Sequence, residues 1–485
     1  MPNDGSIVIA SNRGPISFLA GDDGFDTKRG AGGLAGALDP VARELGSDAV
    51  WVAAATSDTD REALHAGEAE KLEGLLGYPV YLLDIEPEMY GRYYDVVSNQ
   101  MLWFANHCLW DELHITDFGE AEKDAWENAY EPVNHLFAQA ICEVAEPDAL
   151  VLVQDYHLSR LPLFLRELRP NQTIFHFTHS SFCGPEGLER LPRPLPQKVL
   201  EGMLGADLVG FHVARWVHAF FDCSEKIGAK VDRSEGSVFY AGRKTWVRDY
   251  PIPVDPSDLS ERAHQEPASE WARRFKEFAD GPLIVRADRT EPSKNIVRGF
   301  EAFGALLDRR EDLRNTKFVA CVYPSRQTMS VYRKYTREIE EAVVKVNERY
   351  PDSIKLYMKD DFDRTLGAYR EYDVLLVNPL MDGMNLVSKE GPVLNERDGI
   401  LVLSQGAGSY QEMGEAAEVI DDARSVESTA AALERALDMP PAERSRRAAE
   451  LRTAATRTQP SDWIEAQLAD LEAIKAGRPP VRPPA

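Results

Sequence analysis

The chain has 485 residues, of which 44% are hydrophobic, so it is long enough for two large domains or three small ones. Aspartate and glutamate number 80 against 55 lysine and arginine residues, which gives a net charge of −25. This balance argues against general nucleic-acid binding, because such binding needs a cationic surface. Because so acidic a chain repels anionic substrates, a local cluster of basic residues becomes informative.

No run of the sequence reaches the roughly 18 apolar residues that a transmembrane helix needs. The first apolar run, residues 7–10, is predicted to be a strand and not a signal peptide. The five cysteines are odd in number, widely spaced and free of any Cys-x-x-Cys pair, so neither a disulfide framework nor a structural zinc site is expected. A cytoplasmic protein is the simplest expectation.

Short apolar runs alternate with amphipathic segments along the whole chain. The runs are rich in β-branched residues and do not alternate polar with apolar positions, which predicts parallel sheets covered by helices on both faces. The predicted strands are residues 6–11, 49–53, 149–154, 173–178, 208–210, 283–286, 317–322, 374–378 and 400–404. The predicted helices include residues 34–45, 121–144, 297–307 and 329–350.

The segment Tyr250-Pro-Ile-Pro-Val-Asp-Pro256 marks a domain boundary, because three prolines in seven residues cannot lie inside a helix or a central strand. We predict two Rossmann-like, doubly wound α/β domains, over residues 1–252 and 253–458, that face a cleft. A helix at 459–478 is predicted to pack back on the first domain, and the proline-rich residues 479–485 are predicted to be disordered. In such sheets ligands bind beyond the carboxyl ends of the strands.

The most specific motif is Val377-Asn-Pro-Leu-Met-Asp-Gly-Met-Asn-Leu-Val-Ser-Lys-Glu390. A turn at Asp382-Gly383 precedes a helix that is predicted to start near Asn385, and the first N–H groups of such a helix can hold a diphosphate. Asp382 is a candidate acceptor of hydrogen bonds from sugar hydroxyls, and Glu390 from ribose hydroxyls. An ordinary solvated Asp-Gly turn is the alternative interpretation.

A second motif, Arg286-Ala-Asp-Arg-Thr-Glu-Pro-Ser-Lys-Asn295, follows another predicted strand. Arg289 and Lys294 are candidates to neutralise a leaving nucleoside diphosphate, since arginine offers phosphate a planar fork and lysine a point charge. The alternative is a surface loop in which these bases pair with neighbouring carboxylates.

Three further motifs supply candidate residues from the first half of the chain. Asp155 follows a strand and is a candidate to orient an acceptor hydroxyl; a metal site with His157 lacks a third ligand of suitable spacing. His179, at the tip of the next strand, is a candidate to face the cleft. The glycines around Gly33 allow close approach of a phosphate, although the spacing does not match a dinucleotide fingerprint.

Taken together, these motifs resemble the trehalose-6-phosphate synthase family, which has the GT-B fold, from residue 6 to about residue 444. They occur in the family's order: Ser-Asn-Arg13, Gly-Gly33-Leu, Tyr-Tyr94, Asp155-Tyr-His-Leu, Arg289 with Ser-Lys294, Pro-Ser-Arg326, and Asp382-Gly-Met-Asn-Leu-Val. The resemblance implies a retaining glycosyltransferase that joins glucose from a nucleoside diphosphate glucose to glucose 6-phosphate. It implies no metal or other cofactor, no nucleic-acid or membrane partner, and a dimer or tetramer.

The resemblance also implies a role for each candidate. The residues implied to hold the acceptor are Arg13, Tyr94, Trp103 and Arg326 at its phosphate and Asp155 near its reacting hydroxyl. The residues implied to hold the donor diphosphate are Gly33, Arg289 and Lys294 with the N–H groups of Gly383, Met384, Asn385, Leu386 and Val387. The residues implied to hold the donor glucose are His179 and Asp382, and Glu390 is implied to hold the ribose. The residues implied to act in catalysis are Asp155, His179, Arg289, Lys294 and Asp382.

The sequence departs from the family pattern at several positions. Gln154 replaces a histidine, Ser180-Ser-Phe-Cys183 replaces a proline-containing string, and the spacing between Asp360 and the later Asp-Gly turn differs. These features resemble an actinobacterial branch and favour GDP-glucose over UDP-glucose as the donor. Two alternatives stay open: a pseudo-glycosyltransferase that joins a nucleotide-activated cyclitol to an amino-cyclitol phosphate, and a non-catalytic sugar-phosphate sensor.

Overall fold

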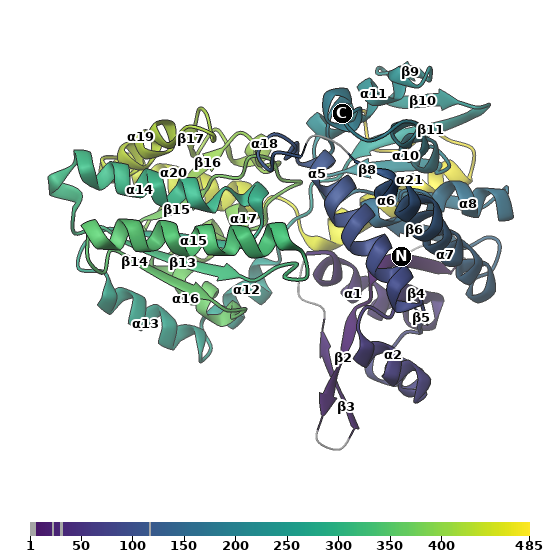
Figure 1. The fold of residues 1–485 in the computed structure, drawn as a ribbon, viewed down its shortest axis with the longest axis horizontal. Helices are drawn as coiled ribbons and strands as arrows, with labels where there is room; N and C mark the ends of the chain where they lie inside the picture. Colours follow the sequence, from purple (N-terminus) through teal and green to yellow (C-terminus); the bar gives the residue numbers. More distant parts are fainter. Residues whose placement is uncertain (1–5, 22–23, 30–32, 116–117) are drawn as a thin grey trace. The chain divides into compact units, whose positions relative to one another are not determined.

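The computed structural model describes residues 6–21, 24–29, 33–115 and 118–485 (Figure 1). The chain divides into two compact units: unit 1 comprises residues 1–252 and 461–485, and unit 2 comprises residues 253–460. It therefore crosses between the units twice, after Ile252 and after Pro460. Among the described residues, no helix combines the length and the apolar character needed to cross a membrane.

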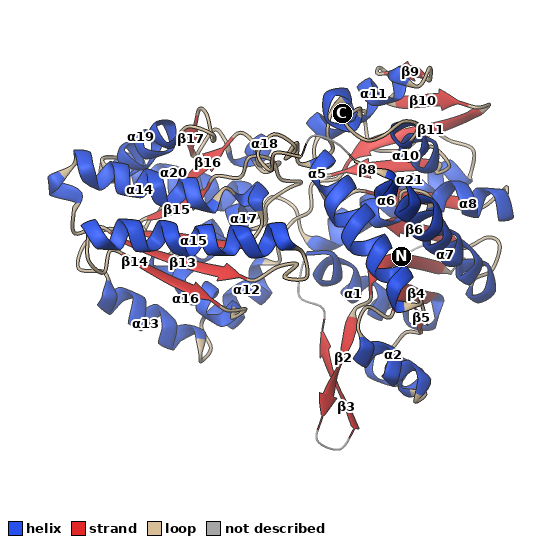
Figure 2. Ribbon diagram, in the orientation of Figure 1, coloured by secondary structure: helices blue, strands red, loops and turns tan. Residues whose placement is uncertain are grey.

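Unit 1 is built on a nine-stranded sheet (Figure 2). Its strands, in spatial order, are β5 (Val80–Leu83), β4 (Ala49–Ala54), β1 (Ile7–Arg13), β6 (Leu150–Gln154), β7 (Thr173–Phe177), β8 (Leu208–Phe211), β11 (Arg243–Asp249), β10 (Ser237–Tyr240) and β9 (Lys230–Asp232). From β1 the chain moves outward through β4 to β5, then returns to β6 and moves outward in the other direction. The strand order therefore reverses between β1 and β6, which is where doubly wound sheets bind ligands.

The helices of unit 1 fill the connections between these strands. The α-helices are α1 (Gly33–Leu45), α2 (Asp58–His65), α3 (Leu72–Leu76), α4 (Pro87–Gly91), α5 (Trp103–Asn106), α6 (Glu120–Ala125), α7 (Glu131–Val144), α8 (Leu161–Leu168), α9 (Pro185–Leu188), α10 (Leu195–Met203), α11 (Ala214–Lys226) and α21 (Pro460–Lys475). The single helix predicted over residues 121–144 is interrupted by a π-helical turn, η4 (Trp126–Tyr130), between α6 and α7. A longer π-helix, η3 (Arg92–Leu102), carries Tyr94 and leads directly into α5.

The sheet of unit 1 also contains antiparallel strands at one edge, which the sequence analysis did not predict. Strand β10 runs antiparallel to both β9 and β11. A separate antiparallel hairpin joins β2 (Ile16–Gly21) to β3 (Gly24–Arg29). These strands are short and leave one face open, with Phe239 of β10 at 48% exposure. They lack the long apolar runs by which the buried parallel strands were recognised.

Unit 2 is a six-stranded, parallel sheet with the same type of reversal. Its strands, in spatial order, are β14 (Ile354–Met358), β13 (Lys317–Tyr323), β12 (Leu283–Arg289), β15 (Val374–Val377), β16 (Ile400–Ser404) and β17 (Glu418–Ile420). Its helices are α12 (Pro256–Ala263), α13 (Ala268–Phe278), α14 (Ile296–Arg309), α15 (Ser330–Arg349), α16 (Phe362–Glu371), α17 (Val387–Leu394), α18 (Tyr410–Met413), α19 (Val426–Leu437) and α20 (Pro441–Ala455). The order reverses between β12 and β15.

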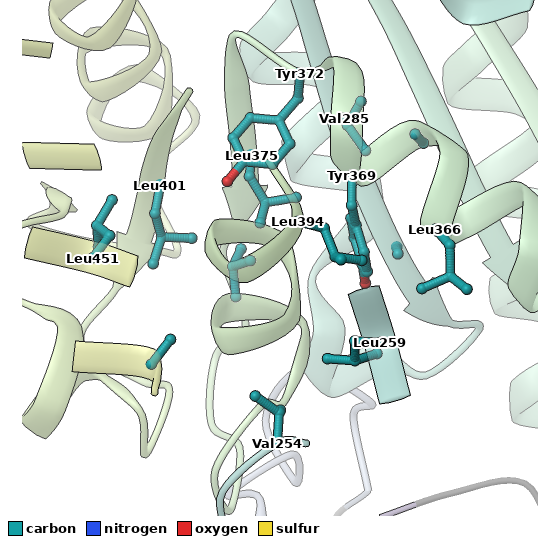
Figure 3. Close-up of a cluster of buried hydrophobic side chains, with 14 of the residues drawn as sticks. Val254, Leu259, Val285, Leu366, Tyr369, Tyr372, Leu375, Leu394, Leu401 and Leu451 are labelled. Carbon is teal, nitrogen blue, oxygen red and sulfur yellow. The ribbon is translucent and has the colours of Figure 1, made fainter. Parts of the chain in front are cut away.

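Alternate residues of the unit 2 strands enter two separate cores, one on each face of the sheet. Val285 and Leu375 pack with helices α12, α13, α16, α17 and α20 (Figure 3). Their neighbours Ile284 and Leu376 pack with α14, α15 and α19 on the other face. Because both faces are buried, these strands need apolar residues at every position, which explains the continuous runs in the sequence.

The last residues of the chain are ordered against unit 1, which corrects the prediction of a disordered tail. The N–H groups of Val481 and Arg482 both donate to Asp470 Oδ1, at 2.5 and 2.9 Å. Arg248 Nε donates to the carbonyl oxygen of Arg482 at 2.8 Å. Asp470 is fully buried, so its carboxylate needs donors, and the extended proline-rich segment supplies them.

Candidate functional site

The loops that follow β12 and β15 meet at the switch point of unit 2. Lys294 Nζ lies 2.5 Å from Asp382 Oδ2, and the two side chains are only 12% and 14% exposed. Burial alone would lower the pKa of Lys294, but the carboxylates of Asp382, Asp288 and Glu291 outweigh it and raise that pKa. The lysine therefore carries a fixed positive charge at the carboxyl end of the sheet.

A buried carboxylate sits between two of the predicted phosphate ligands. Glu291 is fully buried, and its Oε1 lies 3.4 Å from Arg289 Nε and 3.5 Å from one terminal nitrogen of Arg326. Ser325 Oγ donates to the same oxygen at 3.3 Å. The pairing of Arg289 with a neighbouring carboxylate was the alternative interpretation of this motif, but the carboxylate lies inside the fold and Arg289 remains 53% exposed. The guanidinium is thus oriented and still accessible.

The Asp382 turn is braced by a second loop that sequence reasoning missed. Asp382 N donates to Gly406 O at 3.0 Å, Gly408 N to Asp382 O at 3.2 Å, and Ser409 N to Met384 O at 2.8 Å. A Cβ atom on Gly408 would lie 1.9 Å from the carbonyl oxygen of Gly383, so only glycine fits there. The signal for this brace was the Gly-Ala-Gly string just after β16.

The helix after this turn starts later than predicted. Helix α17 begins at Val387, and Asn385 instead adopts a left-handed backbone with φ of 77°. Asn385 Nδ2 donates to Asp382 Oδ2 at 2.9 Å, and its Oδ1 accepts from the Ser388 N–H at 3.2 Å. Asparagine tolerates this backbone conformation and can serve both partners, so it orients Asp382 and caps the helix.

Glu390 lies on α17 and has an unusual carboxyl group. Burial raises its pKa from the ordinary value of 4.5 to about 7. The hydroxyl of Tyr369 donates to Glu390 Oε2 at 3.2 Å, which partly offsets the effect of burial. A second donor, such as a ribose hydroxyl, would favour the ionised form further.

In unit 1, Arg13 and Tyr94 come together at the end of β1. Arg13 lies 3.4 Å from the Tyr94 hydroxyl, and its guanidinium carbon is 5.9 Å from the centre of the Tyr94 ring. The Tyr94 ring stacks on His157, which in turn stacks on Tyr156. His157 Nδ1 lies 3.8 Å from Asp155 Oδ2. The residues predicted from β1, the η3 helix and the loop after β6 therefore form one continuous surface.

Asp155 has a strained backbone at the switch point of unit 1. Its φ is 72° and its ψ is 168°, a region that residues with a Cβ atom rarely adopt. Its Oδ1 accepts the backbone N–H groups of His179 at 3.1 Å and Ser180 at 3.4 Å. This arrangement ties the loop after β6 to the loop after β7 and holds the carboxylate at the sheet edge.

His179 occupies an aromatic pocket. Its ring lies 4.7 Å from Phe177, 5.4 Å from His212 and 6.4 Å from Trp463 of α21, measured between ring centres. Burial lowers the pKa of His179 well below its ordinary value, and His212 and His176 add to the effect. The imidazole is therefore neutral at physiological pH.

The other predicted residues lie elsewhere in these units. Trp103 is buried at 6% exposure, where it stacks on His107 and packs at a tilt against Tyr156. Gly33 is the first residue of α1, whereas Gly30 and Gly32 lie outside the described residues. Arg326 belongs to unit 2, where it donates to the Tyr332 hydroxyl at 2.7 Å. Over the described ranges, no group of three or more His, Cys, Asp or Glu side chains is arranged to hold a metal ion.

Comparison with known proteins decides the family. The model of glycosyltransferase family 20 matches residues 5–473, nearly the whole chain. The chain belongs to glycosyltransferase family 20.

Curated relatives of this chain have more than one activity. Trehalose-6-phosphate synthase from Mycobacterium sp. (strain KMS) is 32% identical over 498 residues, covering 99% of this chain and 97% of the relative. Validamine 7-phosphate valienyltransferase from Streptomyces hygroscopicus subsp. jinggangensis (strain 5008) is 30% identical over 482 residues, covering 97% and 95%.

Solved structures of family 20 share the fold over almost their full length. A structure from E. coli bound with UDP-2-fluoro glucose has a TM-score of 0.81 and 25% identity, with 96% of this chain and 99% of that chain covered. A UDP-forming α,α-trehalose-phosphate synthase from Burkholderia xenovorans, in complex with glucose-6-phosphate, has a TM-score of 0.82 and 26% identity, with 96% and 100% covered. The architecture of two Rossmann-like units is that of the GT-B class.

Proposed function

We propose that this chain transfers glucose from a nucleoside diphosphate glucose to glucose 6-phosphate and releases α,α-trehalose 6-phosphate. The observation that carries the proposal is the contact of Lys294 with Asp382 across the switch point of unit 2. Arg289, in the same loop as Lys294, remains accessible to solvent. Lysine and arginine supply positive charge for a diphosphate, and Asp382 accepts hydrogen bonds from sugar hydroxyls.

In the proposed step, the acceptor oxygen bonds to C1 of the donor glucose as the bond from C1 to the diphosphate oxygen breaks. The electron pair leaves with the diphosphate, whose growing charge Lys294 and Arg289 stabilise. The acceptor attacks from the face that the diphosphate leaves, so its hydroxyl proton passes to the departing oxygen and the configuration at C1 is retained. Neither a metal nor an organic cofactor takes part, and catalysis rests on positioning and charge.

The acceptor is proposed to bind unit 1 through the Arg13–Tyr94 surface. Arg13 is exposed and its guanidinium is oriented by Tyr94, which suits a phosphate group. Asp155, held by two backbone N–H groups, is proposed to accept a hydrogen bond from the sugar near its reacting hydroxyl. Trp103 is proposed to support the ring of Tyr156 in this surface.

The donor base is proposed to be guanine. The loop after β14 carries Asp360, which is exposed, and Asp361, which is engaged as the cap of helix α16. Guanine presents two adjacent N–H donors that one carboxylate can accept together, whereas uracil presents a single one. Asp360 is therefore proposed to read the base.

The transfer of a cyclitol is a second candidate, favoured by the 30% identity to the valienyltransferase. Its chemistry would use the same charged residues at the diphosphate. The Lys294–Asp382 pair, which a donor sugar and its diphosphate both need, also argues against a non-catalytic sensor.

The test is product formation by purified protein with glucose 6-phosphate and, separately, GDP-glucose and UDP-glucose. The expected result is nucleotide release, faster with GDP-glucose, and an α,α-1,1-linked disaccharide phosphate in the NMR spectrum. Release only with a nucleotide-activated cyclitol would assign the second candidate. No release with any donor, although the protein is folded, would overturn the proposal of a transferase at this site.

A further inference from the structure

The side chain of His179 has one specific polar partner, and that partner comes from the neighbouring strand. Gln154, the last residue of β6, places its Oε1 at 2.9 Å from His179 Nε2. Asp155, the next residue, accepts the backbone N–H of His179. The ring of His179 is thus fixed by the last residue of β6, and its backbone by the residue that follows.

The chemistry of this contact determines which ring nitrogen carries the proton. A neutral imidazole has one nitrogen that donates and one that accepts. Because an amide oxygen only accepts, the nitrogen that faces it must be the donor. The rings of Phe177, His212 and Trp463 pack around the imidazole, and the nearby carboxylate of Asp155 accepts the backbone N–H of His179. Burial lowers the pKa of His179, which keeps the ring neutral.

We propose that Gln154 is a positioning residue for His179: it accepts the proton on Nε2 and so leaves Nδ1 as a hydrogen-bond acceptor for a hydroxyl of a sugar substrate. Among the described residues of unit 1, Nδ1 has no hydrogen-bond partner, and His179 remains partly exposed. His176, three residues earlier and on β7, is by contrast fully buried. This inference rests on the proposed function only for the identity of the ligand.

Glutamine is suited to this task because it does not titrate. A glutamate at the same position would also accept from Nε2, but its charge would favour the imidazolium, which has no acceptor nitrogen left. A leucine of similar size would fill the space and leave both tautomers available. Gln154→Glu and Gln154→Leu therefore separate the effect of the acceptor oxygen from the effect of side-chain volume.

The first measurement is the protonation of the two ring nitrogens by ¹⁵N NMR of labelled full-length protein, with the resonances assigned from the His179→Gln variant. We expect a protonated Nε2 and an unprotonated Nδ1 in the wild type, and a mixture of tautomers in Gln154→Leu. Gln172→Leu is the matched control, since Gln172 is equally buried in unit 1 but donates to Ala149 O. A wild type with its proton on Nδ1 would overturn the proposal without any enzyme assay.

The second measurement is the response of Nδ1 to ligands. GDP-glucose or UDP-glucose, whichever binds in calorimetry, is expected to shift the Nδ1 resonance, while glucose 6-phosphate alone leaves it in place. A donor that binds without moving Nδ1 would overturn the assigned role of this nitrogen. Absence of binding by both donors would instead count against the proposed function.

The third measurement is the split between kcat and KM. Gln154→Leu is expected to lower kcat about tenfold with an unchanged KM for glucose 6-phosphate, which corresponds to the loss of one hydrogen bond. Gln154→Glu is expected to retain activity at high pH and lose it as the pH falls and His179 becomes charged. Equal losses in Gln154→Leu and Gln172→Leu would mean that Gln154 only fills the core.

Discussion

Lys294 Nζ lies 2.5 Å from Asp382 Oδ2, and this contact joins the loop after β12 to the loop after β15. The two loops come from the strands between which the order of the sheet reverses. A parallel sheet exposes the carboxyl ends of neighbouring strands at one edge, so residues 88 positions apart in the sequence become partners.

Lys294→Ala and Arg289→Ala are expected to have similar effects on turnover and different effects on stability. Each removes a charge from the leaving diphosphate and should lower kcat by about 100-fold or more. Lys294→Ala also leaves Asp382 buried without its cation, which costs about 3–5 kcal/mol. Arg289→Ala should cost less, because Arg326 and Ser325 remain beside the buried carboxylate of Glu291. Steady-state kinetics and urea unfolding of both variants check this.

The double variant Lys294→Ala/Asp382→Asn is the control for the stability effect. It removes the uncompensated carboxylate, so it should regain part of the free energy of unfolding while remaining inactive. If both single variants turned over substrate at the wild-type rate, the assignment of these residues to the diphosphate would be wrong.

Two replacements of Asp155 distinguish the effect of its strained backbone on stability from the effect of its carboxylate on activity. Asp155→Gly and Asp155→Ala both lose the carboxylate and should both be nearly inactive. Only the alanine keeps a Cβ atom at φ of 72°, so the glycine variant should be more stable by about 1–3 kcal/mol. Thermal and urea unfolding measure the difference; equal stabilities would show that the backbone relaxes without cost.

Gly408→Ala is expected to disable the donor site, although Gly408 has no side chain that could contact a substrate. The added Cβ would collide with the Gly383 carbonyl oxygen and displace the Asp382 turn, at a cost of about 1–3 kcal/mol in stability and a larger loss in kcat. Gly74→Ala in helix α3 is the matched control, because nothing lies within 4 Å of its Cβ position. Crystal structures and kinetics of the two variants should differ accordingly.

Glu390 is expected to make stability depend on pH. The folded carboxyl keeps its proton up to about pH 7, whereas the unfolded chain releases it near 4.5, so unfolding releases a proton between these values and stability falls as the pH rises. Above about pH 7 both states are ionised and the fall ends. The variant Glu390→Gln lacks this dependence.

The measurement is the difference in Tm between Glu390→Gln and the wild type, taken from about pH 4.5 to pH 8. The difference should grow in favour of the variant up to about pH 7 and then stay constant. A bound nucleoside diphosphate should reduce it, because ribose hydroxyls would stabilise the carboxylate in the wild type. Parallel Tm curves over the whole range would contradict the raised pKa.

The strands buried on both faces could be predicted from the sequence because they need an apolar residue at every position. Ile284 and Val285 illustrate this, since each enters a different core. Strands β9 and β10 were missed because they are only three and four residues long, too short for a pattern of apolar residues to stand out. The tail was predicted wrongly because its partner, Asp470, becomes a buried acceptor only in the folded chain.

The motifs named candidate site residues, but the sequence did not reveal their partners. Motifs named Lys294 and Asp382 but gave no sign of their contact. Glu291 stood in the sequence as a neighbouring carboxylate, and only its complete burial shows that it orients Arg289 and Arg326. The same holds for the left-handed Asn385, since a helix start and a turn capped by a side chain share the same preferred residues.

Because the chain crosses between the units twice, the two units cannot fold in the order in which they are synthesised. Residues 253–460 form one uninterrupted stretch, whereas unit 1 needs residues 461–485 to finish. Trp463 packs on Phe177 and donates to the carbonyl oxygen of Tyr250. Before Trp463 is synthesised, the apolar site that it fills in unit 1 is exposed. Unit 2 can therefore fold during synthesis, whereas unit 1, whose first 252 residues are synthesised earlier, can complete its fold only after residues 461–485 are made.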